Sequence, residues 1–171
     1  NTDFLKRTFY YKYSLQDGKS STNFSFGYLT RGNGIINHLS NIYENQYEKN
    51  VTKFFNSKVL WDFDNIKLES NTHWFDHRDE LAYDKNVGGW DNYSNTEIGV
   101  NFNSIINWGW GASKPGFTYN REINSNTAVK EIERDHYSLN LQHDFSINKL
   151  KINLGMSCNY YDDFGWFSAP G

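Results

Sequence analysis

The 171-residue sequence has few residues that cross-link a chain or that interrupt strands. It holds one cysteine, Cys158, so it has neither an internal disulfide nor a zinc site built from several cysteines. Cys158 lies in an alternating run, and we interpret it as a small apolar side chain. The two prolines, Pro115 and Pro170, leave most of the chain free to form the backbone hydrogen bonds of a sheet.

Long apolar runs are also missing. No stretch approaches the roughly 18 apolar residues of a membrane-spanning helix, and the mean hydropathy is -0.78. Hydropathy alone would predict a soluble protein, but strands of transmembrane barrels alternate in polarity and average out in a hydropathy window. Residues 1–7 lead directly into a strand pattern without a signal peptide. We therefore expect a leader to have been removed or to lie outside this sequence.

The charge is close to balanced, with a net charge of -3 and a pI near 5.9. Nothing in it indicates a nucleic-acid partner, which would require a basic patch. Aromatic residues make up 18% of the chain, and asparagine and serine are abundant. Many aromatic residues beside many polar ones are typical of a sheet with one apolar face and one wet face.

Period-two alternation is the main structural signal. In each run the residues of one parity are apolar and those of the other parity are polar, and His143 is the one polar interruption on the apolar side of its run. The clearest apolar sets are Phe9, Tyr11, Tyr13 and Leu15; Phe24, Phe26 and Tyr28; Ile98, Val100 and Phe102; Tyr137, Leu139, Leu141 and Phe145; and Leu150, Ile152, Leu154, Met156, Cys158 and Tyr160.

The pattern predicts an all-β, antiparallel, up-and-down sheet of about eight strands. Short turns are expected around 16–19, 62–65, 106–107 and 148–149, because Asp-Gly and Asn-Lys pairs suit tight hairpins. Longer polar stretches near 32–50, 80–95 and 122–135 are expected to be loops. The weakest strand is 108–121, which we expect Lys114, Pro115 and Gly116 to bend or interrupt.

Short turns on one rim and long loops on the other are the layout of outer-membrane barrels, in which the turns face the periplasm. Aromatic residues such as Trp61, Trp108, Trp110, Tyr160 and Tyr161 cluster near strand ends, as at membrane interfaces. A soluble sandwich could place aromatic residues similarly, but a soluble barrel would need a dry inner face. We therefore expect a transmembrane β-barrel segment whose aromatic face meets lipid.

If the tight turns are periplasmic, residues 1 and 171 both lie near the extracellular rim. A complete outer-membrane barrel usually has both termini on the periplasmic side. We therefore expect residues 1–171 to be a partial barrel domain from the interior of a larger one, with no plug domain of its own.

Several segments resemble the middle of the barrel in TonB-dependent receptors, especially the cobalamin-transporter-like type of Bacteroidetes. The resemblance covers residues 94–171, and the segments 24–61 and 73–79 are compatible with it. The segments that carry it are 95–102 (NTEIGVNF), 110–113 (WGAS), 121–123 (REI), 136–143 (HYSLNLQH), 149–155 (KLKINLG) and 165–171 (GWFSAPG), the last resembling the start of a further strand.

This resemblance implies a 22-stranded barrel with a plugged lumen in the bacterial outer membrane. Such receptors bind a scarce ligand, such as cobalamin or a metal chelate, and import it with energy from TonB. The implied partners are outer-membrane lipid, a small-molecule ligand and, through parts not in this sequence, TonB.

Candidate binding residues lie in the stretches expected to be loops. Five aromatic residues could grip a ligand by stacking: Tyr43, Tyr47, Tyr83, Trp90 and Tyr93. They could equally pack the loops together. An oxygen-rich cluster could hold Ca²⁺ through Asp76, Asp79, Glu80 and Asp84, or it could be a solvated, charge-mixed loop. Apart from this Ca²⁺, no cofactor is expected.

Catalysis is not expected. Gly18-Lys19-Ser20 lacks the first glycine of a phosphate loop, and neither H-E-x-x-H nor G-x-S-x-G occurs. Ser138 should face away from His143, which removes the nearest serine–histidine pair. The alternatives to a transporter segment are a complete small eight-stranded outer-membrane structural or adhesion protein and a soluble ligand-binding barrel.

Overall fold

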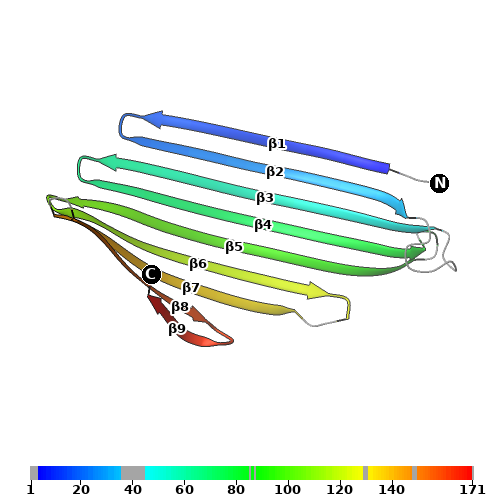
Figure 1. The fold of residues 1–171 in the computed structure, drawn as a ribbon. Coiled ribbons are helices and arrows are strands. Elements are labelled where there is room, and N and C mark those ends of the chain that lie inside the picture. The colour runs from blue at the N-terminus through cyan, green and yellow to red at the C-terminus, as the bar shows by residue number, and fades with distance from the viewer. Residues whose placement is uncertain are drawn as a thin grey trace.

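The computed structural model describes residues 4–35, 45–84, 86, 88–128, 131–147 and 150–170. They form one antiparallel, up-and-down sheet of nine strands in chain order, laid side by side (Figure 1). The strands are β1 (Phe4–Asp17), β2 (Ser20–Ile35), β3 (Gln46–Phe63), β4 (Ile66–Asp84), β5 (Gly88–Trp108), β6 (Gly111–Asn126), β7 (Ile132–Ile147), β8 (Leu150–Tyr161) and β9 (Gly165–Pro170). The all-β, up-and-down prediction is confirmed.

Tight turns join the strand pairs at one end of the sheet. Asp17 pairs with Ser20 and Phe63 with Ile66, so each of these hairpins has a two-residue turn at a predicted place. Gly18 adopts a φ of 52°, which a turn this short demands and which glycine tolerates. The predicted turn at 148–149 lies outside the described residues.

The turn predicted at Ile106-Asn107 is wrong, because both residues belong to β5. Asn107 pairs with Ala112, so the turn lies at Gly109-Trp110. The physical reason is a tertiary contact: the ring of Trp110 stacks on Phe145 of β7 with centroids 5.5 Å apart. The turn propensities of the residues near 106–110 carry no information about this contact with β7.

The predicted long loops are largely wrong, because the strands continue through most of the polar stretches. β4 runs to Asp84 and β5 begins at Gly88, so the expected loop at 80–95 is almost entirely strand. β6 and β7 likewise fill most of 122–135. Polar composition indicates exposure to water, whereas cross-strand partners decide whether a backbone is strand. Here ion pairs between neighbouring strands, such as Lys49–Glu80 at 2.8 Å, accompany the extended ladders.

Pro115 weakens one ladder but does not end its strand. β6 pairs with β5 on both sides of the proline, at Asn103–Gly116 and Ile106–Ser113, in unchanged register. Pro115 still lies opposite Leu141 of β7. A proline without an N–H removes a ladder bond on one side only, so the predicted interruption is confined to the β5 side.

The described strands number nine rather than about eight. The additional strand, β9, follows the three-residue loop 162–164, and its first residue, Gly165, takes a φ of 81°. It lies where the resemblance implied a further strand. The strand order runs from β1 to β9 without closure, so the described sheet is open at both edges.

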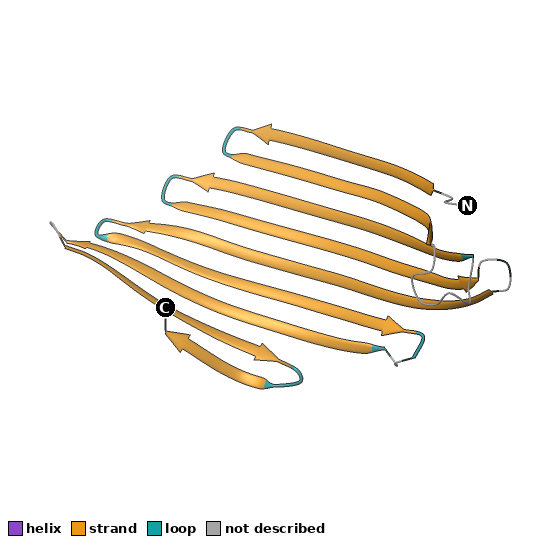
Figure 2. Ribbon diagram, turned by 45° about the vertical axis from the view of Figure 1, so that its right-hand side comes forward, coloured by secondary structure: helices purple, strands orange, loops and turns teal. Residues whose placement is uncertain are grey.

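The sheet is a single layer, as two views show (Figures 1 and 2). In the described part of the chain, Ala82 is the only buried residue with an apolar side chain, and the other buried residues are polar or are glycines. None of the described residues forms a helix that could cross a membrane. A sheet with an apolar face has to bury that face against something, and no second layer does so within the described strands.

The register places the apolar sides of all strands on one face. Tyr11 lies opposite Phe26, which lies opposite Phe55 and then Trp74 and Ile98. The alternation therefore continues across the sheet, as expected. We call the side that carries these residues the apolar face and the opposite side the polar face.

Candidate functional site

The apolar face is broad and uncovered. Many of its large residues keep about 40–60% of their surface exposed, including Phe102 (40%), Leu139 (54%) and Leu154 (57%). Soluble monomers rarely expose so continuous an apolar surface, and large patches mark contact with protein or membrane. The face is therefore the first element of a functional surface.

An aromatic ladder crosses this face toward the end away from the tight turns. Tyr119, Tyr137, Tyr160 and Trp166 come from four consecutive strands and lie in one cross-strand row. Their ring centroids are 4.9, 6.1 and 4.9 Å apart in that order. We call this row the tyrosine ladder. Tyr119 also donates a hydrogen bond of 2.9 Å to Asp135, so its hydroxyl points toward the charged residues at the end of the strands away from the tight turns.

A second group of aromatic residues lies beside the tight turns. Trp108 donates from Nε1 to the Ser113 hydroxyl over 3.0 Å, and the same hydroxyl contacts His143 Nδ1 at 2.7 Å. The Trp110 ring lies 5.3 Å from the His143 ring. His143, the polar residue that interrupts the apolar row of β7, is thus hydrogen-bonded through Nδ1 and lies against aromatic rings. We call the part of the apolar face that lies between this group and the tyrosine ladder, and its continuation across the neighbouring strands, the apolar region.

The polar face carries amides, lysines and carboxylates joined by hydrogen bonds. Lys58 lies 3.1 Å from Glu69, and His73 lies 3.0 Å from Glu97. Asn101 donates to Thr118 over 2.8 Å. Ser138 is on this face, opposite Thr118 and Asn159, so its expected separation from His143 is confirmed.

Two glycines let side chains lie flat against this polar face. A Cβ at Gly99 would lie 2.1 Å from Cε1 of His73, and one at Gly27 would lie 2.5 Å from the Phe54 ring. The rings therefore cross the backbone of the neighbouring strand. Close approach of this kind is what glycine within a strand permits.

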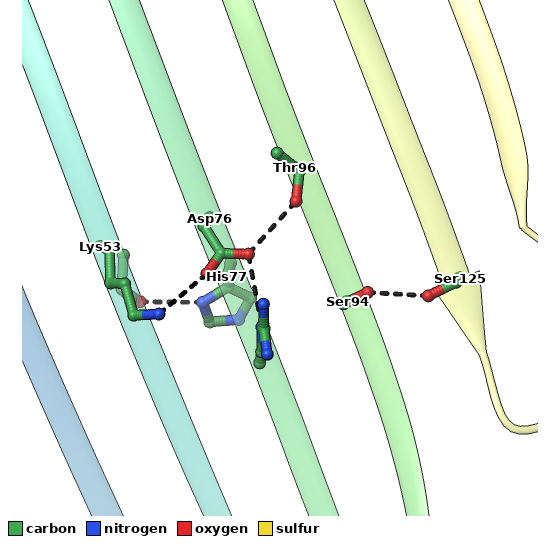
Figure 3. A network of polar contacts seen from close by, with 8 residues as sticks. Lys53, Asp76, His77, Ser94, Thr96 and Ser125 are labelled. Carbon is green, nitrogen blue, oxygen red and sulfur yellow. Dashed lines mark hydrogen bonds and ion pairs between the residues drawn. The ribbon is translucent and has the colours of Figure 1, made fainter.

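Charged residues appear on the apolar face beyond the aromatic rows, at the end away from the turns. Asp76 accepts a 3.2 Å hydrogen bond from Thr96 and lies 3.5 Å from Lys53 and 3.4 Å from Arg78 (Figure 3). Asp76 is only 3% exposed. Its carboxylate lies beneath two cations whose side chains keep 41% and 57% of their surface exposed. We call Lys53, Asp76, Arg78 and Thr96 the Asp76 cluster.

A second charged pair lies beyond the tyrosine ladder on β6 and β7. Arg121 bonds to Glu133, and Asp135 lies directly opposite Arg121 in the register. Arg121 is outside the apolar region, where the Glu133 carboxylate raises the pKa of its guanidinium. The apolar region therefore ends at charged residues along both β4 and β6.

A shallow polar groove lies next to the Asp76 cluster. It lies across the ends of β4, β5 and β6 and is lined from both faces. Its lining residues are Arg78, Asp79, Glu80, Asn92, Tyr93, Ser94, Ser125 and Asn126, with Thr127 directly after β6. Ser94 and Ser125 share a 2.8 Å hydrogen bond across the two strands (Figure 3). The groove offers hydroxyl, amide and charged groups, which suit a polar ligand.

The predicted aromatic ligand contacts divide between the two faces. Tyr47 and Trp90 meet edge to face on the apolar-face side with centroids 6.4 Å apart, and Ala82 lies between them in the register, fully buried. Tyr83 bonds to Asp91 and Tyr93 donates to Asn124 over 3.2 Å, both on the polar face. All four lie in strands rather than loops. Tyr43 lies outside the described residues.

The predicted calcium ligands are not brought together. Asp76 and Glu80 point to one side of β4 and Asp79 to the other, because strand residues alternate. Glu80 pairs with Lys49 at 2.8 Å, Asp79 with His77 at 3.0 Å, and Asp84 accepts from the backbone N–H of Asn86 at 2.9 Å. Within the described ranges no group of three potential ligands could hold a metal ion.

Sequence reasoning missed that Asp76 and Arg78 belong to the apolar-face row of β4. They continue the parity of Trp74, so the signal was present in the alternation. It was overlooked because the polar stretch was assigned to a loop. The burial of Asp76 had no sequence signal, since it depends on Lys53 of β3 and Thr96 of β5 as well as on Arg78 of its own strand.

Comparison with models of known protein families finds no match to this chain, and comparison with curated proteins finds none either.

Proposed function

We propose that these strands form part of the wall of a transmembrane β-barrel in the bacterial outer membrane. We further propose that the barrel is a TonB-dependent transporter that imports a scarce ligand such as cobalamin or a metal chelate. In this proposal the apolar face meets lipid and the polar face lines the lumen. The role is transport, and no catalytic step is assigned to the chain.

The observation that carries the proposal is the difference between the two faces of one layer. The apolar face exposes large aliphatic and aromatic side chains, whereas the polar face has hydrogen-bonded amides and ion pairs. Barrel strands in the outer membrane alternate in this way, with apolar residues toward lipid and polar residues toward the lumen. A soluble barrel would need the aromatic residues to pack inward.

The height of the apolar region supports the same proposal. On β4 it runs from Ile66 to Trp74, with the small hydroxyl residues Ser70 and Thr72 between them, and the charged Asp76 follows on the same face. At about 3.3 Å per residue this is roughly 26 Å along the strand, or about 20 Å along the membrane normal at a tilt near 40°. Apolar bands of outer-membrane barrels are about 25 Å tall and are bordered by aromatic residues.

Strand length points to a barrel that projects beyond the lipid. β5 spans 21 residues and β4 spans 19, whereas about 9–11 tilted residues cross a bilayer. The residues beyond the Asp76 cluster would then stand outside the membrane. The transport role draws in addition on the resemblance of residues 94–171 to TonB-dependent receptors.

Quenching of tryptophan fluorescence by brominated lipid tests the lipid-facing side. Trp74 lies on the apolar face and its neighbour Phe75 on the polar face. In two single-tryptophan proteins folded into vesicles, one retaining Trp74 and one carrying Phe75→Trp with Trp74→Phe, we expect strong quenching only for Trp74. Equal quenching at both positions would refute the lipid-facing assignment.

Uptake measurements test the transport role separately. Cells with and without the gene would be compared for accumulation of labelled cobalamin and labelled iron chelates at nanomolar supply. We expect the gene to confer uptake of one of them, and we expect a protonophore to abolish that uptake, because TonB uses the energy of the inner membrane. Unchanged uptake together with lipid-facing tryptophans would favour a structural or adhesive barrel.

A further inference from the structure

The rows of side chains beyond the apolar region follow a definite order. On β4 the apolar-face residues are Trp74, Asp76, Arg78, Glu80 and Ala82, and alternate residues of a strand lie about 6.6 Å apart. Across β3, β4 and β5 the Trp74 row is apolar, and the last row is aromatic again. The three rows between them carry Lys53, Arg78 and the Lys49–Glu80 pair, beside the hydroxyl and amide groups of Thr96, Ser94 and Asn92 on β5. Such an order complements a molecule with acyl chains, an anionic group and sugars in sequence.

We propose that this surface binds the headgroup of a phosphorylated glycolipid of the membrane's outer leaflet. Its acyl chains lie along the apolar face, its phosphate contacts the Asp76 cluster, and its sugars lie in the groove and against Trp90. This inference rests on the proposed function, because it requires the apolar face to meet lipid.

The cation excess of the Asp76 cluster selects it as the phosphate site. Lys53 and Arg78 share one carboxylate, and that carboxylate is 3% exposed while both cations are far more exposed. The other ion pairs of this zone, Lys49–Glu80 and Arg121–Glu133, match each cation with its own carboxylate. Asp76 therefore orients two cationic groups outward and leaves one positive charge uncompensated, which favours a phosphate.

The groove provides contacts for sugar hydroxyls next to Arg78. Arg78 belongs to both the cluster and the groove, so a phosphate at Arg78 places an attached sugar over Ser94 and Ser125. Asn92 and Thr127 line the same groove one row further out. Hydroxyl and amide groups bind sugars through hydrogen bonds that they also make with water, so charge and stacking must supply much of the selectivity.

The aromatic pair provides that stacking surface at the outer end. Trp90 is 39% exposed and meets Tyr47 edge to face at 6.4 Å. The Tyr47 ring lies over Gly32, where a Cβ would come within 1.9 Å of its hydroxyl oxygen. The pair is held in place by β2, β3 and β5, which keeps a flat ring available to a sugar.

Native mass spectrometry of the folded full chain in phosphatidylcholine nanodiscs tests this inference. The nanodiscs would carry a defined mole fraction of phosphorylated glycolipid, and the number of retained glycolipids would be counted. We expect Lys53→Gln and Arg78→Gln each to weaken retention about fivefold, the effect of one cation near an anionic surface. Trp90→Ala should weaken it also, whereas Arg78→Lys should restore most of the retention.

A matched control lies on β3 and faces the other way. Lys58 lies 3.1 Å from Glu69 with 46% exposure, close to the values for Lys53. Lys58→Gln should leave retention unchanged. Loss of retention in this control equal to that in Lys53→Gln would overturn the proposal.

Further measurements distinguish a lipid-borne phosphate from free phosphate, and they distinguish failure of this inference from failure of the barrel proposal. Inorganic phosphate and the chain-free headgroup saccharide should not compete at millimolar concentration, and dephosphorylated glycolipid should be retained at least fivefold less. Competition by inorganic phosphate would identify a free-anion site and overturn the lipid assignment. If Trp74 is quenched by brominated lipid but glycolipid is not enriched, this inference fails and the barrel proposal stands. If Trp74 is not quenched, both fail.

Discussion

Trp74 and Asp76 lie two residues apart on the same face of β4, and the apolar region of that face ends between them. Trp74 neighbours Phe55 and Ile98, whereas Asp76 neighbours Lys53 and Thr96. Over one repeat of the strand, the surroundings change from aromatic and aliphatic groups to a lysine and a hydroxyl group. That boundary gives the sheet a direction along its strands.

A charge in the middle of the apolar face should damage assembly. We expect Leu154→Arg to destabilise the membrane-inserted state by about 2–4 kcal/mol, because an arginine on the lipid face of a barrel loses its hydration. The adjacent Asn153→Arg, on the polar face, should change stability by no more than about 0.5 kcal/mol. Urea titrations in vesicles measure both, and equal tolerance of the two substitutions would contradict the assignment of faces.

The buried carboxylate of Asp76 should contribute measurably to stability. Asp76→Asn removes the charge that Lys53 and Arg78 share, and we expect a loss of about 1–3 kcal/mol, as for charge-assisted hydrogen bonds. Asp79→Asn is the control, since Asp79 is on the same strand, faces the other way and has a 37% exposed side chain. Its loss should be below about 1 kcal/mol. A larger loss at Asp79 would show that burial does not set the effect.

The tyrosine ladder should stabilise the C-terminal part of the sheet. Tyr137 contacts the rings of both Tyr119 and Tyr160, so Tyr137→Ala removes two ring contacts. We expect a loss of roughly 1–3 kcal/mol beyond that of apolar burial, at about 0.5–1.5 kcal/mol for each pair. Tyr137→Phe keeps both rings in contact and should remain close to the native stability. Equal denaturation midpoints for the two variants would argue against the ladder.

The hairpin between β5 and β6 offers a pair of glycines with opposite expectations. A Cβ at Gly111 would lie 2.0 Å from the backbone oxygen of Asp144, whereas one at Gly109 meets nothing within 4 Å. Gly111→Ala should cost about 1–3 kcal/mol, because the β6 and β7 backbones must separate. Gly109→Ala should be neutral or slightly stabilising through the unfolded chain. Thermal unfolding of both variants in detergent measures the difference, and an intact Gly111→Ala protein would show that the backbone can yield.

Much of the fold could be predicted because its main signal is local. Alternation along β7 and β8 assigns Leu139, Leu141 and Leu154 to one side whatever their neighbours are. Asp17-Gly18 marks a hairpin through the positive φ that glycine allows. By contrast, the turn at Gly109-Trp110 depends on the packing of Trp110 on Phe145, which comes from a separate strand.

The candidate site was predicted less well, for a related reason. Tyr47 and Trp90 were recognised as candidate contacts, but their meeting across the buried Ala82 follows from the pairing of β3, β4 and β5. The tyrosine ladder likewise needs four strands in register. Composition could not reveal that the polar stretches are strand. The backbone of a strand forms its ladder hydrogen bonds with the neighbouring strands, and the composition of the strand does not record where those neighbours lie.

The sequence by itself determined which side chains share a face, because side-chain direction repeats every two residues along a single strand. Only the tertiary structure decided which rows meet across strands, where the apolar region ends, and that Asp76 is covered by Lys53 and Arg78. Those features depend on register, and register is a relation between segments that lie tens of residues apart.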